Sequence, residues 1–145
     1  MIKEVELVAG TDLTATKAKT KKFLGNYDAF RLLVSSSFQP KVTQTYSVEL
    51  TDFSGGEKGN PLDSFIIKQE AAKEKLDKMF RVLNSLESDH RVLLVSKYID
   101  KKYRYDFEIM NFMGVSESRY YEILGDALIA FAFGYGKDLV VEVEE

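Results

Sequence analysis

The sequence predicts a mainly α-helical protein that carries a helix-turn-helix in its C-terminal third and one or two short extended segments. Apolar residues recur at three- and four-residue steps over most of the 145-residue chain, which is the period of an amphipathic helix. Recognisable helix starts and stops, such as Pro61 and Gly114, separate these periodic stretches. The chain contains no cysteine, so its fold does not depend on a disulfide framework.

Residues 1–41 are predicted to form an N-terminal basic helix region. After a strand-like lead over residues 2–8, a long helix is expected from Thr11 or Asp12 to about Leu33, with Asp12 as its cap. Its apolar stripe comprises Phe23, Leu24, Tyr27, Phe30 and Leu33 or Val34. Because the lysines lie opposite this stripe, the helix is expected to pack by one face and to expose a basic face to solvent.

Residues 42–61 are predicted to be an extended arm followed by a flexible loop. The stretch KVTQTYSVEL alternates β-branched and polar residues, as an extended strand does. The following stretch, DFSGGEKGNP, is rich in glycine and polar turn residues. It lacks the GxxxxGK[ST] spacing of a phosphate-binding loop, so it is interpreted as a linker.

Residues 62–137 are predicted to be helical, and residues 138–145 to form an acidic tail. Pro61 suits the first turn of a helix, where its missing N–H costs little. Helical segments are expected over 62–86, 89–99, 105–113 and 116–133. The tail sequence KDLVVEVEE alternates like a short edge strand, and a frayed end is the open alternative.

A helix-turn-helix is predicted over about residues 89–133. Gly114 falls where the turn between two crossing helices needs a left-handed backbone. Val115 is expected to pack between the two helices, and Ser116 is expected to cap the second one. The elements therefore follow the order helix, basic connection, short helix, tight turn and longer helix.

The period of the last helix predicts which of its residues are buried. The expected buried stripe comprises Tyr120, Ile123, Leu124, Ala127, Leu128 and Phe131. The expected outward residues near the helix start are Glu117, Ser118, Tyr121, Glu122 and Gly125, with Arg119 at the boundary. In a helix-turn-helix, outward residues at this end of the second helix contact base edges in the major groove.

The region from about Leu83 to Phe133 resembles region four of bacterial sigma factors. The matching pattern comprises Arg91 with Leu93 and Leu94, Tyr98, Phe107 with Ile109, the GVS turn, and the pair Ala127 and Leu128. The chain also contains a lysine-rich first helix, a mid-chain loop and, above all, the SESRYY run from Ser116 to Tyr121 with a downstream alanine and Phe-Ala pair. In these features the whole chain resembles the ArpU family of phage late-transcription regulators from Gram-positive hosts.

The resemblance implies a sequence-specific DNA-binding protein that activates late genes of a phage or prophage, with RNA polymerase as an optional partner. Contacts with bases are expected from Glu117, Ser118, Arg119, Tyr121 and Glu122. Contacts with DNA phosphates are expected from Lys97, Lys101, Lys102, Arg104 and Ser116. Double-stranded DNA is thus the expected partner, and a homodimer is left open because the helix over 62–86 is long enough to form its interface.

Composition argues against several function classes. The net charge of −3 argues against unspecific wrapping of nucleic acid, although the lysines of the first helix and of the basic connection form local basic surfaces. One histidine and no cysteine make a zinc site unexpected, and nothing in the sequence indicates an enzyme, a cofactor or a small-molecule substrate. The acidic N-terminus and the lack of a long apolar run predict a cytoplasmic protein of a bacterial host cell with no membrane segment.

The sequence leaves two other functions open. The acidic residues Glu117 and Glu122 suit a protein-interaction module that docks on RNA polymerase or another regulator without binding DNA directly. A phage packaging component of the small-terminase type also carries a helix-turn-helix, and it would form a ring-like oligomer.

Overall fold

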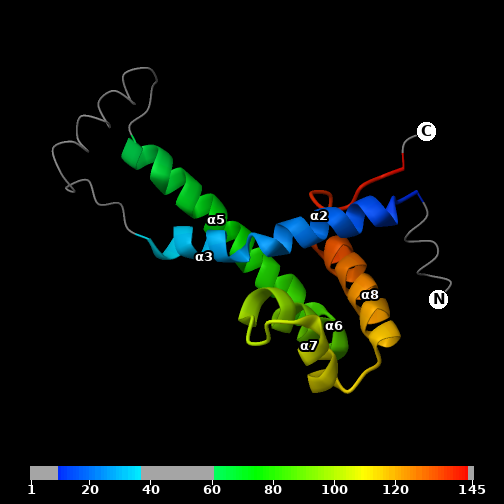
Figure 1. Ribbon diagram of the computed structural model, residues 1–145. Coiled ribbons are helices and arrows are strands. Elements are labelled where there is room, and N and C mark those ends of the chain that lie inside the picture. The colour runs from blue at the N-terminus through cyan, green and yellow to red at the C-terminus, as the bar shows by residue number, and fades with distance from the viewer. Residues whose placement is uncertain (1–9, 37–60, 144–145) are drawn as a thin grey trace. The chain divides into compact units, whose positions relative to one another are not determined.

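The computed structural model describes residues 10–36 and 61–143, and every named element in these ranges is a helix (Figure 1). The helices are α2 (Leu13–Gly25), α3 (Tyr27–Ser35), α5 (Pro61–Ser85), α6 (Ser88–Leu94), the π-helix η1 (Val95–Asp100), α7 (Asp106–Met113) and α8 (Glu117–Tyr135). The predicted mainly α fold class is confirmed. The extended lead predicted over 2–8 and the arm and loop predicted over 42–60 lie outside the described residues.

The chain divides into two compact units. The main unit comprises Met1–Asp28 and Lys78–Glu145, and the small unit comprises Ala29–Asp77. Helix α5 contributes residues to both units, and it begins at Pro61, as the sequence predicts. All of the residues predicted to contact DNA belong to the main unit.

The long N-terminal helix predicted to end near Leu33 is in fact two helices, so that prediction was wrong. Helix α2 ends at Gly25, and α3 begins at Tyr27. Asn26 caps α2 with φ −88° and ψ 5°, and its N–H donates to the Phe23 carbonyl at 3.1 Å. Glycine and asparagine are common where a helix ends, and this signal outweighs the continuous apolar period. The predicted cap is confirmed, because the Asp12 carboxylate accepts the Ala15 N–H at 3.0 Å.

The small unit pairs the end of α3 with the first part of α5. The side-chain amide of Gln69 donates to the carbonyls of Leu33 and Val34 at 3.1 Å each and to that of Ser36 at 2.8 Å. These contacts supply donors to carbonyl groups at the end of α3 and just after it. Lys75 also lies over the ring of Phe30, with its Nζ 5.5 Å from the ring centroid.

Helix α8 is the centre of the main unit, and α2 and α6 pack against it. Its buried residues are Tyr120, Ile123, Leu124, Ala127, Leu128, Phe131, Ala132 and Tyr135. The predicted stripe is therefore buried as expected, and it continues for one more turn than predicted. Phe23 of α2 packs on the end of this stripe, with its ring centroid 4.8 Å from that of Tyr135.

The start of the C-terminal tail is paired with the segment before α2. The Asp12 N–H donates to the Val141 carbonyl at 2.7 Å, and the Val143 N–H donates to the Gly10 carbonyl at 2.8 Å. Thr11 and Glu142 form an isolated antiparallel bridge between them. Of the described tail residues, 141–143 take part in this pairing, which is an isolated bridge and not the edge strand that was one of the two predicted alternatives.

The helix predicted over 89–99 changes its form after Leu94. Helix α6 ends there and continues as the π-helix η1, which Lys101 terminates in a left-handed conformation with φ 52°. A π-helical turn places side chains at a wider period than an α-helix, so the α-helical pattern does not predict their directions there. Within residues 10–36 and 61–143, no helix is both long enough and apolar enough to cross a membrane.

Candidate nucleic-acid interface

The turn between α7 and α8 is built from Gly114, Val115 and Ser116. Gly114 has φ 71° and ψ 36°, the left-handed conformation that favours glycine. The N–H groups of Gly114 and Val115 both donate to the Met110 carbonyl, at 2.8 and 3.1 Å. The Ser116 hydroxyl then caps α8 by accepting the Arg119 N–H at 3.1 Å. The predicted roles of the glycine and the serine are thus confirmed.

The first turns of α8 expose to solvent the residues that are predicted to contact bases. Glu117, Ser118, Arg119, Tyr121 and Glu122 are all exposed, and we call this set the outward face of α8. The adjacent tyrosines separate as the helical period requires, because Tyr120 is fully buried whereas Tyr121 is 47% exposed. Side chains on this face are therefore free of the core and accessible to a partner.

Charged groups on the outward face already interact with one another. The Arg119 guanidinium donates to the Glu122 carboxylate at 2.6 Å, one helical turn away. Both side chains are more than half exposed, so this ion pair contributes little to stability and can be broken by a competing anion. Arg119 is thus held in place by Glu122 without being buried.

The four basic residues predicted to contact phosphates fall into two kinds. Lys97 forms an ion pair with Asp106 at 2.7 Å, and Lys101 forms one with Asp28 at 2.6 Å. Lys102 and Arg104 are exposed and form no ion pair with any residue that the structure describes. Of these four residues, Lys102 and Arg104 therefore present uncompensated positive charge next to α7.

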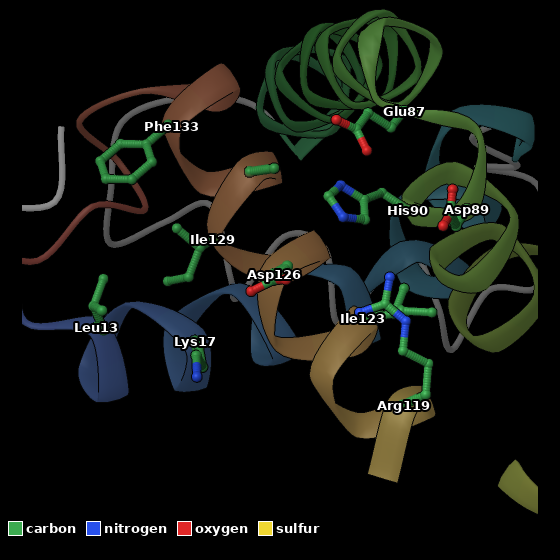
Figure 2. Close-up of a pocket in the computed structure, with 11 residues that line it drawn as sticks. Leu13, Lys17, Glu87, Asp89, His90, Arg119, Ile123, Asp126, Ile129 and Phe133 are labelled. Carbon is green, nitrogen blue, oxygen red and sulfur yellow. The ribbon is translucent and has the colours of Figure 1, made fainter. Parts of the chain in front are cut away.

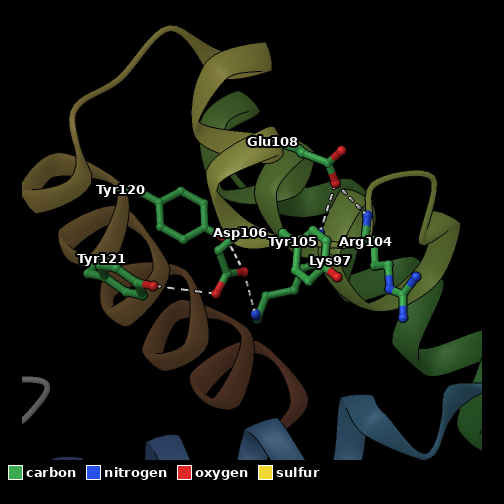
Figure 3. Close-up of polar contacts among 7 residues, drawn as sticks. All are labelled: Lys97, Arg104, Tyr105, Asp106, Glu108, Tyr120 and Tyr121. Atoms are coloured by element: carbon green, nitrogen blue, oxygen red, sulfur yellow. Dashed lines mark hydrogen bonds and ion pairs between the residues drawn. The ribbon is translucent and has the colours of Figure 1, made fainter.

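Asp106 joins the basic connection to the outward face of α8 (Figure 3). Its carboxylate accepts from Lys97 at 2.7 Å, from the Tyr120 hydroxyl at 2.8 Å and from the Tyr121 hydroxyl at 3.4 Å. Because these donors come from η1 and α8, one carboxylate at the start of α7 connects three helices. No local sequence pattern indicates that Asp106 meets these residues, so its role could not be predicted.

The environment of Asp106 keeps it charged and keeps its tyrosine partners neutral. Burial alone would raise the pKa of the Asp106 carboxyl, but hydrogen bonds from Lys97 and Tyr120 and the charge of Lys97 outweigh it and lower that pKa. Burial and the negative charge of Asp106 raise the pKa of Tyr98 to about 12. Burial and the hydrogen bond to Asp106 also raise the pKa of Tyr120. The tyrosine hydroxyls therefore act as neutral donors.

The start of α7 is capped by its own third residue, Glu108 (Figure 3). The Glu108 carboxylate accepts the backbone N–H groups of Arg104 and Tyr105 at 2.9 Å each. A carboxylate in this position also interacts favourably with the helix dipole. The backbone that carries Arg104 and Tyr105 is thus fixed, while their side chains remain exposed.

A pocket of about 470 Å³ lies beside the outward face, between α2, α6 and α8 (Figure 2). Its lining residues are Leu13, Lys17, Glu87, Asp89, His90, Arg119, Ile123, Asp126, Ile129, Ala130 and Phe133. Acidic and basic groups alternate around it, so its charge selects no single class of ligand. Gly125, predicted to face outward, is instead half-buried, because Lys17 covers it: a Cβ at this position would lie 3.2 Å from the Lys17 Nζ.

Comparison with known proteins supports the resemblance given by the sequence. The chain is similar to the ArpU protein of Streptococcus phage O1205, whose name proposes for it an autolysin regulatory role. The two are 27% identical over 138 residues, which cover 94% of this chain and 99% of the relative. No family model matches the chain, and no solved structure matches it. The predicted resemblance to the ArpU family is confirmed over nearly the whole length of both proteins.

Proposed function

Because the chain is ArpU-like over nearly its whole length, we propose that it is a sequence-specific DNA-binding regulator of transcription. The observation that carries this proposal is the outward face of α8, whose polar side chains are exposed directly after a tight, capped turn. An α-helix fits the major groove of DNA, and the first turns of the second helix are where such motifs contact base edges.

The arginine, the serine and the two glutamates of the outward face have hydrogen-bonding chemistry that suits base edges. Arg119 can donate two parallel hydrogen bonds to guanine, and Ser118 can donate or accept. Glu117 and Glu122 can accept from the amino group of cytosine, although their charge repels phosphates. Glu122 engages Nη1 of Arg119, so a guanine would accept from the remaining N–H groups of the guanidinium or displace Glu122.

Phosphate contacts are proposed for the residues that flank this face. Lys102 and Arg104 offer unpaired positive charge, and the Ser116 hydroxyl can still donate to a phosphate while it caps α8. Lys97 is held by Asp106, so its proposed contribution is to set the local charge and position of that carboxylate. Lys101 would have to be shared with Asp28.

The biological setting forms a further part of the proposal. We place the protein in the cytoplasm of a bacterial host, where it activates late genes of a phage or prophage. The relative's name, a regulatory protein of a phage, supports the regulatory role. A homodimer and a contact with RNA polymerase are consistent with such a role, because dimers suit palindromic operators.

The test is selection of duplexes from a random library by the full-length protein, followed by anisotropy titrations at several salt concentrations. We expect a preferred sequence, and we expect Arg119→Ala and Tyr121→Ala each to weaken its binding about tenfold, as the loss of one base contact does. Arg81→Ala, which removes an exposed arginine of α5 in the same unit, is the matched control and should change little. Absence of binding to any duplex at low salt contradicts the proposal.

The charge of the outward face favours one second candidate, a protein-interaction module. Glu122 compensates Arg119, and Glu117 and Asp126 leave this side of α8 acidic. An acidic helix face suits a basic surface on a protein such as RNA polymerase. Co-purification with polymerase that persists in Arg119→Ala and is lost in Glu117→Lys would support this candidate over direct DNA reading.

A further inference from the structure

We propose that the loop before α7 and two exposed phenylalanines of α7 form a second binding surface, one that takes unpaired DNA bases. The surface comprises Lys102, Tyr103, Arg104, Tyr105, Phe107 and Phe112, and we call it the aromatic–cationic surface. All six residues belong to the main unit. This inference goes beyond the proposed reading of duplex DNA, because it concerns different side chains and a different form of DNA.

Three of the four aromatic rings of this surface are exposed, although the same unit buries other aromatic rings completely. Tyr105, Phe107 and Phe112 are 51, 58 and 60% exposed, whereas Tyr120 and Phe131 are fully buried. Exposing a large aromatic ring forgoes the free energy of its burial, so a group of such rings commonly marks an interaction site. The rings are therefore available for a partner.

Cations and aromatic rings alternate along this surface. The Lys102 Nζ lies 5.6 Å from the Tyr103 ring centroid, and the Arg104 Cζ lies 5.4 Å from that of Tyr105. The rings of Tyr105 and Phe107 are parallel to within 8°, with their centroids 5.6 Å apart. The Tyr103 and Phe112 rings also lie 5.6 Å apart. This arrangement places positive charge over the rings of Tyr103 and Tyr105 and leaves parts of the rings of Tyr105, Phe107 and Phe112 exposed to a base.

The combination of charges and rings favours single-stranded nucleic acid as the occupant. A strand with unpaired bases supplies both phosphates for Lys102 and Arg104 and planar bases for the rings. Asp106 and Glu108 stand among these residues in the sequence, but the Asp106 carboxylate accepts from Lys97, and the Glu108 carboxylate accepts from the backbone N–H groups of Arg104 and Tyr105. In duplex DNA the bases are stacked on one another, so only unpaired bases can stack on this surface.

The aromatic–cationic surface adjoins the outward face of α8. Tyr105 directly precedes Asp106, and the Asp106 carboxylate accepts from Tyr121 at 3.4 Å. DNA held on the outward face would therefore pass close to the exposed rings. A duplex with unpaired bases beside the recognised sequence would engage both surfaces at once.

The test uses the full-length protein and labelled DNA of about 16 nucleotides, the upper end of typical site sizes for single-strand binding. The probes are a single strand, its duplex, and a duplex with a central stretch of mismatches. We expect the double variant Tyr105→Leu/Phe107→Leu to lose at least about tenfold in affinity for the single strand, because base–aromatic stacking is lost. Leucine keeps an apolar side chain, and Phe80→Leu, at another exposed phenylalanine of this unit, is the matched control.

The outcomes separate this inference from the proposed function. If Tyr105→Leu/Phe107→Leu loses binding to the single strand and to the mismatched duplex but binds the perfect duplex unchanged, the result supports binding of unpaired bases at the aromatic–cationic surface. This holds even if Arg119→Ala has no effect. Upfield shifts of the Phe107 ring signals on addition of the single strand would support stacking directly. No single-strand binding by the natural protein, equal losses on all three probes, or the same loss in Phe80→Leu would each overturn the inference.

Discussion

The turn before α8 and the basic connection before α7 present their side chains by different means. In the turn, Ser116 caps its own helix, and the outward face of α8 stays exposed because of the helical period alone. In the connection, Lys97 and Lys101 are held by Asp106 and Asp28, which lie 9 and 73 residues away in sequence. The first segment thus depends on neighbours in sequence, and the second depends on the tertiary fold.

This difference changes which side chains are available to a partner. A helix cap leaves the side chains around it free, because it uses backbone N–H groups and one hydroxyl. A lysine that is paired with a distant carboxylate must give up or share that ion pair before it can contact a phosphate, and this costs free energy. The outward face of α8 therefore keeps the residues predicted for it, whereas half of the basic connection is already engaged.

The largest effect is expected from Asp106→Ala, which removes the centre of the long-range contacts. The variant leaves the half-buried Lys97 and the hydroxyl of the buried Tyr120 without their acceptor. We expect a loss of about 2 kcal/mol in the free energy of unfolding, measured by urea denaturation, because unpaired buried polar groups cost that much. Asp126→Ala, at an exposed carboxylate of α8, should change stability by less than about 0.5 kcal/mol.

The same carboxylate predicts a pH dependence with a definite sign. The pKa of Asp106 in the folded protein lies below its usual value of 3.8, so the unfolded chain binds the proton more readily. Its stabilising effect is complete above about pH 4 and is lost as the pH falls through the lower folded pKa. The stability gap between the natural protein and Asp106→Asn should narrow below that pH; a constant gap would contradict this assignment.

The caps and faces of the C-terminal third could be predicted from the sequence because they depend on near neighbours. Gly114, Ser116 and the buried stripe of α8 follow from backbone conformation, capping chemistry and the 3.6-residue period. The start of α5 at Pro61 follows in the same way. The sequence also contains a signal for the break at Asn26, but the apolar stripe continues across it and favours a single helix.

The contacts of Lys97, Lys101 and Asp106 could not be predicted, because they depend on how helices pack. A lysine next to a predicted DNA-binding motif has the same sequence pattern whether it faces solvent or a carboxylate. The π-helix η1 adds to this difficulty, since its wider turn redirects Lys97 in a way that an α-helical period does not describe. Gly125 was misassigned for a similar reason, because the side chain that covers it comes from α2.

A smaller effect on stability is expected from Gly114→Ala, which tests the turn before α8, the segment that depends on neighbours in sequence. A Cβ at Gly114 meets no atom within 4 Å, so any loss of stability comes from the left-handed backbone alone. We expect a cost of about 1 kcal/mol in urea denaturation. Gly25→Ala is the matched control: its Cβ also meets nothing and its φ is not positive, so the substitution should stabilise α2 slightly. Equal effects of the two variants would show that the turn does not require glycine.

The smallest effect on stability is expected from Lys101→Ala, and it separates the two kinds of basic residue. The ion pair of Lys101 with Asp28 is nearly half exposed, so its loss should cost no more than about 0.5 kcal/mol. In duplex-DNA titrations, Lys102→Ala should lower the dependence of log affinity on log salt by about 1, as the loss of one phosphate contact does. Lys101→Ala should lower it by less, because Asp28 already compensates part of its charge. If the two variants reduce the salt dependence equally, the ion pair of Lys101 with Asp28 does not limit the contact of Lys101 with DNA. Paired and unpaired lysines would then contribute equally to DNA binding.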